Sequence, residues 1–175
     1  MSFIIRNAKI EDAEEILNIY SYYVLNTAIT FDVIVPTVDE FKNRIKEFSK
    51  RYPYLVIEEN NKVVGYAYAV LFHNREAYKY SVELSIYLDN NYTKMGLGRR
   101  LYNDMENRLK DMGVKNLYSC ITKPDISDQY VDNNSEEFHK RMGFNLVGEF
   151  HKCGYKFNKW YNVIWMEKMI WIEKN

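Results

Sequence analysis

The sequence predicts a single α/β (α+β) domain, spanning residues 1–175, in which helices flank a mixed β-sheet. A length of 175 residues suits one compact domain with a substantial core. No internal repeat or low-complexity linker divides the chain, and all three prolines fall between periodic segments. Strand and helix patterns follow one another in the order βααβββαβαββ. Because hairpins join some of these strands and helices join others, we expect both parallel and antiparallel pairs.

In the first half of the chain, the spacing of apolar residues predicts two amphipathic helices. The first begins at Lys9 or Asp12 and repeats apolar residues at helical spacing. The second begins at Thr37, which forms a capping-box pattern with Glu40, and ends before Pro53. The predicted strands of this half are residues 3–6, 54–59, 62–71 and 80–88.

The second half of the chain predicts two more helices. One opens at Gly98, carries an apolar stripe and stops at Gly113. The other begins at Asn134 or Ser135 and ends at Gly143. The predicted strands of this half are residues 117–121, 144–151 and 161–170.

The composition argues against several classes of function. The 24 basic and 24 acidic residues cancel, so no net field favours nucleic acid or an anionic membrane. No apolar run approaches the roughly 18 residues of a membrane span, and no secretory signal is recognisable. Cys120 and Cys153 form no C-x-x-C pair, and the histidines lack ligand spacing, so we expect neither a disulfide nor a metal site. The expectation is a cytoplasmic protein with both cysteines in its core.

The strongest chemical feature is the turn Thr93-Lys94-Met95-Gly96-Leu97-Gly98, which joins a strand to an amphipathic helix. Two glycines let the backbone approach an oxyanion closely, and the helix offers unpaired N–H groups at the positive end of its dipole. Lys94, Arg99 and Arg100 add positive charge. No Gly-Lys-Ser/Thr follows, and position 101 is leucine, so neither the Walker nor the Rossmann pattern fits. The turn therefore predicts a phosphate cradle, with a purely geometric role for the glycines as the alternative.

Nine further short segments, spread along nearly the whole chain, form a pattern typical of one protein family. They are Thr30-Phe31, Tyr52-Pro53, Gly65-Tyr66-Ala67, residues 72–78, residues 82–87, Ser135, Phe138-His139, Gly143-Phe144 and residues 154–160. Together with the glycine turn, they resemble the GNAT N-acetyltransferases, in particular the phosphinothricin acetyltransferase branch. The resemblance implies a GNAT-type, mostly antiparallel central sheet of about seven strands. It also implies acetyl-CoA as co-substrate, no metal, a small-molecule amine as acceptor and a homodimer.

The resemblance assigns cofactor contacts to the strand before the turn, to the turn and to a later helix start. These residues are Ile86, Tyr87, Leu88, Lys94, Met95, Gly96, Leu97, Gly98, Arg99 and Asn134. The strand is expected to hold the pantetheine arm as an added strand and to offer an N–H to the thioester oxygen. Thr93 replaces the usual glutamine or arginine. Asp132 stands where asparagine is usual, so Asp132, Asn133 and Asn134 are alternatives for one contact.

Two side chains are candidates for proton transfer. The resemblance places a catalytic glutamate at Glu83, where a carboxylate would accept the proton of the attacking amine. The alternative for Glu83 is an ion pair on the strand face, for example with Arg75. The resemblance places His139 where an acid would protonate the departing thiolate. The alternative for His139 is a residue that packs near the cofactor without transferring a proton.

The acceptor is expected to be a small primary amine, such as phosphinothricin, methionine sulfone or methionine sulfoximine. The candidate acceptor-binding residues are Phe31, Arg75, Tyr78, Lys156 and Trp160. Arg75 or Lys156 would bind a carboxylate, and Phe31 and Trp160 would wall the cleft. Placement in the core or at a dimer surface is the alternative for these residues. The alternative functions are a non-catalytic acyl-CoA sensor and a protein lysine or N-terminal acetyltransferase.

Overall fold

The computed structural model describes residues 2–171. Its helices, strands and 3-10 turns follow one another in the predicted order βααβββαβαββ, which is confirmed. In chain order they are β1 (Phe3–Asn7), η1 (Ile10–Asp12), α1 (Ala13–Asn26), α2 (Val38–Phe48), β2 (Tyr54–Glu59), β3 (Lys62–Leu71), η2 (Glu76–Tyr78), β4 (Ser81–Leu88), η3 (Asn90–Tyr92), α3 (Leu97–Asp111), β5 (Asn116–Lys123), α4 (Asn134–Arg141), β6 (Asn145–Lys156) and β7 (Lys159–Met169).

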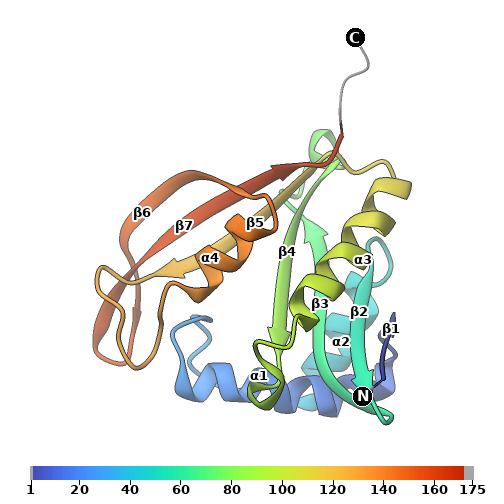
Figure 1. Ribbon diagram of the computed structural model, residues 1–175, viewed down its shortest axis with the longest axis horizontal. Helices are drawn as coiled ribbons and strands as arrows, with labels where there is room; N and C mark the ends of the chain where they lie inside the picture. The colour runs from blue at the N-terminus through green and yellow to red at the C-terminus, as the bar shows by residue number, and fades with distance from the viewer. Residues whose placement is uncertain (1, 172–175) are drawn as a thin grey trace.

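All seven strands belong to one sheet in the order β1-β2-β3-β4-β5-β7-β6 (Figure 1). The β4–β5 pair is parallel, and the other neighbours are antiparallel. The predicted mixed, mostly antiparallel sheet is therefore confirmed. β4 and β5 are joined through α3, because two parallel strands need a crossover between them.

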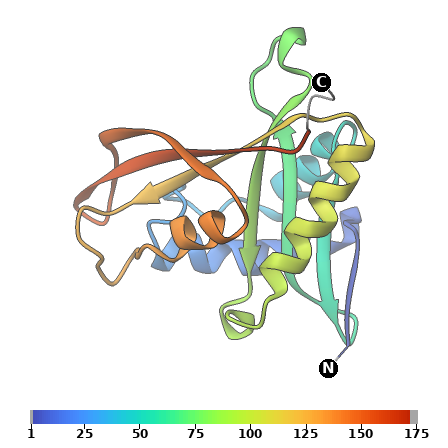
Figure 2. The same ribbon diagram turned by 45° about the horizontal axis from the view of Figure 1, so that its top comes forward.

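Helices cover both faces of the sheet (Figure 2). α1 and α2 pack on one face, where their apolar residues meet buried residues of β2 and β3. α3 and α4 lie on the other face, in a second cluster that includes residues of β4, β5 and β7. Side chains of β4 alternate between these faces, so Val82 and Leu84 join the α3 cluster while Tyr87 joins the α1 cluster.

The helix starts follow local rules of backbone chemistry. Thr37 and Glu40 form the predicted capping box, with the Glu40 N–H bonded to Thr37 Oγ1 at 3.2 Å. α3 begins at Leu97, one residue before the prediction, because Gly96 adopts a left-handed φ of 78° as its N-cap. Gly113 has a φ of 82° just beyond the other end of α3, as predicted for a helix stop.

Two expectations about the last third of the chain are wrong. β6 continues to Lys156 and β7 begins at Lys159. The two strands therefore form one long hairpin, whereas two shorter strands were expected. Phe157 and Asn158 make its turn with φ values of 52° and 58°, and a phenylalanine gives no sequence signal for that conformation. Both cysteines are exposed rather than placed in the core.

The described part of the chain lacks two kinds of feature, a membrane-spanning helix and a cluster of metal ligands. No helix among residues 2–171 has the length and apolar character needed to cross a membrane. Over the same residues, no three His, Cys, Asp or Glu side chains are grouped so that they could hold a metal ion.

Candidate active site

The sheet opens between β4 and β5. These strands pair only from Ser81 with Asn116 to Glu83 with Tyr118, and they then diverge (Figure 1). Beyond that point β4 continues to pair with β3 along its other edge. The divergence leaves one edge of β4 unpaired in the middle of a sheet, where backbone groups need other partners. An extended ligand with amide groups fits such an edge.

Backbone direction identifies which β4 residues face this opening. The Phe72 N–H binds Ser81 O at 3.1 Å and the Asp89 N–H binds Val64 O at 2.9 Å, so odd-numbered residues of β4 bond to β3. Because the direction alternates along the strand, the even-numbered residues of β4 point toward β5. The parallel bridge of Glu83 with Tyr118 uses the Leu84 N–H, so the Leu84 C=O and both backbone groups of Ile86 point into the opening. The backbone of Tyr87, by the same alternation, faces β3.

The predicted contact at Leu88 is partly occupied within the protein. The Tyr23 hydroxyl donates to Leu88 O at 2.6 Å. Of the three predicted β4 contacts, Ile86 is therefore the one whose backbone groups face the opening without a bond from a neighbouring side chain among residues 2–171.

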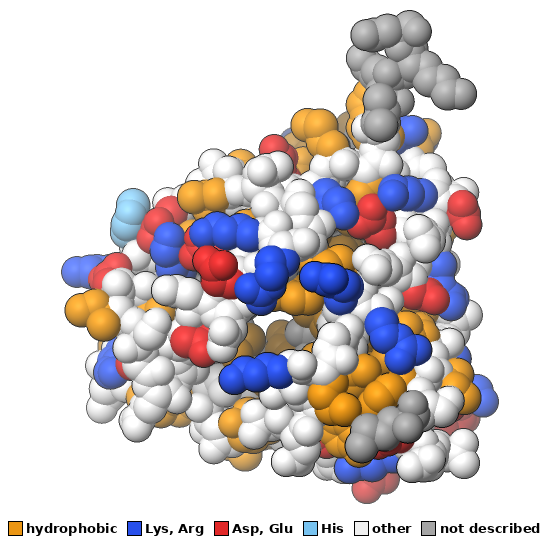
Figure 3. Space-filling view, viewed as in Figure 1, with side chains coloured by type: hydrophobic (Ala, Val, Ile, Leu, Met, Phe, Trp, Pro, Cys, Tyr) orange, Lys and Arg blue, Asp and Glu red, His pale blue; other side chains and the backbone are white. Residues whose placement is uncertain are grey.

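A small cavity of about 60 Å³ lies in the opening. It is lined from both faces of the sheet by Ile29, Leu84, Ser85, Ile86, Tyr87, Tyr102, Ser119, Cys120, Ile121, Thr122, Ser135 and His139. Figure 3 shows a hollow in the corresponding face of the molecule, bordered by Lys and Arg side chains. A larger groove of about 430 Å³ lies elsewhere, between α1 and the turn after β4. His139 and the unpaired edge of β4 line the smaller cavity and not the larger groove, whereas Glu83 lines neither. The smaller cavity is therefore the better candidate for the reaction site.

Glu83 lies on the last β4 residue that pairs with β5, at the closed end of the opening. It alternates with Ser85 and Tyr87 and so faces the α1–α2 side of the sheet. Its side chain is half-buried, and this burial raises the pKa of the carboxyl above its ordinary value. Among residues 2–171 Glu83 has no ion-pair partner, Arg75 included. A partly buried carboxylate with a raised pKa and no ion-pair partner is characteristic of a functional site.

His139 lies on the opposite face and is only 3% exposed. Its Nδ1 is 2.7 Å from Ser135 O, which can only accept, so Nδ1 carries the proton. Its Nε2 lies 3.0 Å from the Tyr102 hydroxyl and accepts from it. Burial lowers the pKa of His139 to about 4. The imidazole is therefore neutral at physiological pH, and both of its nitrogens are engaged.

Acidification is expected to destabilise the protein through His139. In the unfolded chain this histidine binds a proton below about 6.5, whereas the folded protein resists protonation until about 4. The free energy of unfolding should therefore fall across this window, by roughly 3 kcal/mol from this group. Denaturant titrations at several pH values measure the effect. His139→Phe should flatten the dependence and the exposed control His151→Gln should retain it; the same slope in both variants would refute the assignment.

Ser119 adds an unpaired hydroxyl to the same cavity. Its Oγ is the one buried side-chain polar atom without a hydrogen-bond partner among residues 2–171. Such groups are rare, because leaving a buried hydroxyl unpaired costs about 1–3 kcal/mol. The opening therefore offers a polar ligand two kinds of partner. One is the unpaired backbone edge of β4, and the other is the unpaired Ser119 hydroxyl of β5.

The glycine turn lies where β4 leads into α3. Arg100 N–H makes the first helical bond to Gly96 O at 3.2 Å, which leaves the N–H groups of residues 97–99 as unpaired helix-start donors. Glycine is required at positions 96 and 98 for different physical reasons. Gly96 needs its positive φ and has open space around it, whereas a Cβ on Gly98 would lie 3.3 Å from the Phe138 ring. Gly98 therefore serves close packing of α3 on α4.

The remaining predicted cofactor residues are exposed, three of them at this turn and Asn134 at the start of α4. Lys94 has a φ of 61°, and Met95 is 43% exposed. Arg99 is also exposed, on the first turn of α3. Asn134 starts α4, where its backbone N–H donates to Asp132 Oδ1 at 2.9 Å and its side-chain amide also donates to Asp132. Asp132 thus orders the helix start and occupies the Asn134 amide.

The predicted acceptor residues fall into two groups. Phe31 and Lys156 are linked through Thr30. Lys156 is 5% exposed and its Nζ donates to Thr30 O at 2.8 Å, so its ammonium holds the loop that carries Phe31. Phe31 also fills the space beside Gly154, where a Cβ would lie 2.2 Å from its ring. The others are exposed residues at separate places. They are Arg75 and Tyr78 in the β3–β4 loop and Trp160 on the β6–β7 hairpin.

Four residues near the site were not predicted from the sequence. Tyr102 and Ser119 line the cavity, and Asp32 and Arg44 lie on the acceptor side. Tyr102 follows Leu101 on the apolar stripe of α3, so its position toward the sheet was available as a signal. Ser119 and the Asp32–Arg44 pair carried no comparable signal, because their roles depend on which strands and loops meet.

Comparison with known proteins agrees with this geometry. Residues 5–165 match the family described as the acetyltransferase (GNAT) domain. A phosphinothricin N-acetyltransferase from Streptomyces viridochromogenes is 28% identical over 91% of this chain and 83% of its own. The L-amino acid N-acyltransferase MnaT from Escherichia coli is 30% identical over 93% of this chain and 91% of its own.

The same likeness holds among solved structures. A phosphinothricin acetyltransferase from Sinorhizobium meliloti, in complex with AcCoA, superimposes with a TM-score of 0.87 at 30% identity, over 97% of this chain and 89% of its own. The match of the family over nearly the whole chain, the seven-stranded sheet and the opening beside β4 all agree. The chain belongs to the GNAT acetyltransferases.

Proposed function

We propose that this enzyme transfers the acetyl group of acetyl-CoA to the primary amine of a small, amino-acid-like acceptor, by direct attack within a ternary complex. The observation that carries the proposal is the opening between β4 and β5, whose cavity is lined from both faces of the sheet. Acetyl-CoA enters along the α3–α4 face, and the amine enters from the α1–α2 face beside Glu83. The phosphinothricin and L-amino acid transferases named above support this acceptor class.

Glu83 is proposed to accept the proton of the amine, directly or through a water. An α-amino group titrates near 7.7–8.0 and a lysine amine near 10.4, so much of either is protonated at neutral pH and lacks a lone pair. Burial raises the pKa of the Glu83 carboxyl, which brings it closer to that of the amine and favours proton transfer. Its lack of an ion-pair partner among residues 2–171 leaves the carboxylate available.

The α3 start and the β4 edge are proposed to hold acetyl-CoA. The N–H groups of residues 97–99, with Lys94 and Arg99, would bind the pyrophosphate. The C=O of Leu84 and the backbone of Ile86 would bind the pantetheine arm, and the Ile86 N–H would stabilise negative charge as it develops on the carbonyl oxygen.

His139 is proposed to position Tyr102. A neutral imidazole whose single proton is bonded to Ser135 O has none to give through Nε2. Its Nε2 instead fixes the Tyr102 hydroxyl at the wall of the cavity. Of the two roles open for His139, the geometry thus favours packing and orientation over acid catalysis.

Release of free CoA thiol in the presence of an amine panel tests the proposed activity. The panel holds phosphinothricin, methionine sulfone, methionine sulfoximine, common amino acids and lysine-containing peptides. Thiol release with the small amino acids supports the proposal. Tight acetyl-CoA binding without release from any amine would instead indicate a sensor domain, and release with peptides alone would indicate a protein acetyltransferase.

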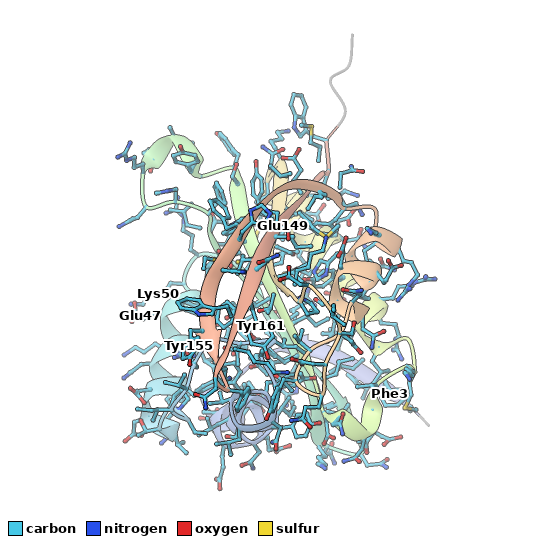
Figure 4. All side chains as sticks on the ribbon, turned by 90° about the vertical axis from the view of Figure 1, so that its left-hand side faces the viewer. Phe3, Glu47, Lys50, Glu149, Tyr155 and Tyr161 are labelled. Carbon is cyan, nitrogen blue, oxygen red and sulfur yellow. The ribbon has the colours of Figure 1, made fainter. Side chains whose placement is uncertain are left out.

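We also propose a cytoplasmic homodimer. Leu146, Val147, Phe150, Tyr155 and Trp160 place exposed apolar side chains on the β6–β7 hairpin. Figure 4 labels Tyr155 and Tyr161 on this hairpin; Tyr155 is 53% exposed and Tyr161 is buried. Light scattering coupled to size exclusion measures the mass, and a monomer at micromolar concentration would contradict the dimer.

A further inference from the structure

Ser119 lies at the closed end of the opening between β4 and β5. It follows Tyr118, the last β5 residue that pairs with β4, so it is the first β5 residue beyond the point where the strands diverge. Only 1% of Ser119 is exposed, and its Oγ has no hydrogen-bond partner among residues 2–171. It lines the same cavity as Ile86. Because buried hydroxyls are rarely left unpaired, Ser119 indicates a partner that a bound ligand supplies.

The Ser119 side chain faces the α3–α4 side of the sheet. Side chains alternate along a strand, and the residues two positions away, Leu117 and Ile121, both belong to the α3 cluster. Glu83 pairs with Tyr118, and both of these side chains face the α1–α2 side. The Ser119 hydroxyl and the candidate base therefore lie at the same end of the opening, on opposite faces of the sheet.

Two neighbouring side chains on the Ser119 face have already committed their protons. The Tyr102 hydroxyl donates to His139 Nε2 at 3.0 Å, and His139 Nδ1 donates to Ser135 O at 2.7 Å. Burial raises the pKa of Tyr102, and the Ser119 hydroxyl is near enough to oppose part of that rise. The two hydroxyls nevertheless form no hydrogen bond with each other. The Ser119 proton is therefore free to turn toward a ligand in the cavity.

The proposed position of acetyl-CoA determines which of its atoms meets Ser119. With the pyrophosphate at the start of α3, the pantetheine arm follows the β4 edge back toward Glu83. The arm must end where β4 and β5 pair, so the thioester lies at the closed end of the opening. The amine approaches the carbonyl carbon from the Glu83 face, and the Ile86 N–H meets the carbonyl oxygen at the strand edge. The sulfur, which joins the carbonyl to the arm on the α3–α4 side, is then the thioester atom that faces Ser119.

We propose that the Ser119 hydroxyl donates a hydrogen bond to the sulfur of acetyl-CoA and stabilises the thiolate as it departs. The inference rests on the proposed function and deepens it, because it assigns a donor to the leaving group. Glu83 lies on the other face, and the single proton of His139 is bonded to Ser135 O, so neither of them supplies that donor. Ser119 is thus a further catalytic residue.

The proposed step conserves atoms and charge. The amine nitrogen forms a bond to the carbonyl carbon, and its proton passes to the Glu83 carboxylate. The C–S bond breaks, and its electron pair moves to the sulfur. A serine hydroxyl is a weaker acid than a thiol, so Ser119 keeps its proton and stabilises the thiolate through a charge-assisted hydrogen bond. Water then protonates the released thiolate, and Glu83 returns its proton to water.

Replacing Ser119 with alanine tests the contribution to the rate. Ser119→Ala should lower kcat by roughly 10–100-fold, the usual contribution of a hydrogen bond to a charged group. Its melting temperature should equal or exceed that of the parent, because the substitution removes a buried hydroxyl that is unpaired without ligand. The control Ser21→Ala removes a hydroxyl that donates to Leu17 O within α1, and it should keep the parent kcat. A parent kcat in Ser119→Ala would overturn the proposal.

Calorimetry with two cofactor analogues tests the contact with sulfur directly. CoA and desulfo-CoA, which lacks the thiol, are titrated at neutral pH and at about pH 9.5, above the ordinary thiol pKa of about 8.5. At the higher pH the ratio of the CoA Kd to the desulfo-CoA Kd should be roughly 10–100-fold larger in Ser119→Ala than in the parent. At neutral pH, where CoA carries a neutral thiol, the ratios of parent and variant should be close.

The binding measurement separates failure of this inference from failure of the proposed function, because it needs neither an acceptor nor turnover. The larger ratio in Ser119→Ala at the higher pH supports the contact even if no amine is acetylated. An equal ratio in parent and variant at that pH would overturn the proposal even if the enzyme acetylates amines. A lower kcat together with an equal ratio would place the hydroxyl away from the sulfur and would also refute it.

Discussion

Replacing Glu83 with glutamine is expected to lower turnover at neutral pH by roughly 100- to 10,000-fold, the usual contribution of a general base. Glutamine preserves the size of the side chain and its place on β4 but does not accept the proton. Glu83 lies outside the predicted phosphate cradle, so the dissociation constant for acetyl-CoA should stay close to that of the parent. Steady-state rates and calorimetric titration of acetyl-CoA measure the two effects.

The pH dependence gives this prediction a second signature. A base must be deprotonated to act, so kcat/KM should fall on the acid side as Glu83 takes up a proton. Because burial raises the pKa of Glu83, this fall should occur above the ordinary glutamate value of 4.5. The variant should lose that acid limb and regain rate at high pH, where the amine loses its proton to water.

A matched control is available in the exposed Glu76, which pairs with Lys79 at 3.3 Å on the β3–β4 loop. Glu76→Gln makes the same chemical change away from the opening and should keep the parent rate and pH profile. Turnover in Glu83→Gln equal to that of this control at every pH would remove Glu83 from the base role.

The second large effect is expected at Gly96. Alanine disfavours a φ of 78°, so Gly96→Ala should displace the turn and misalign the N–H groups at the start of α3. A lost charge-assisted contact to phosphate corresponds to roughly 10–100-fold weaker acetyl-CoA binding. Calorimetry measures the dissociation constant, and denaturant titration measures the stability of the same samples.

Gly113 provides an unusually close control for this substitution. It has a φ of 82° at the opposite end of α3, and no heavy atom lies within 4 Å of a Cβ at either glycine. Both alanine variants should lose about 1 kcal/mol of stability, but only Gly96→Ala should weaken acetyl-CoA. Equal affinity in the two variants would contradict the cradle. Gly98 is less suitable, because its substitution also disturbs Phe138.

The sequence by itself determined the order of the elements, the mixed sheet and the family. Those features depend on local signals, such as apolar periodicity, the capping box at Thr37 and the glycines on either side of α3, which act between residues close in the chain. The turn of Phe157 and Asn158 escaped prediction because its conformation depends on the pairing of the strands it joins rather than on its residue types.

Only the tertiary structure decided how the candidate residues are used. Burial makes His139 neutral, and the loop of residues 27–36 engages Lys156. The partnership of Asp32 with Arg44 also exists only where that loop meets α2. Charge state and hydrogen bonding depend on desolvation and on neighbours distant in the chain, so residue type and spacing do not specify them. Residue types and their spacing therefore specify which groups are present, whereas packing decides which of them remain free for a ligand.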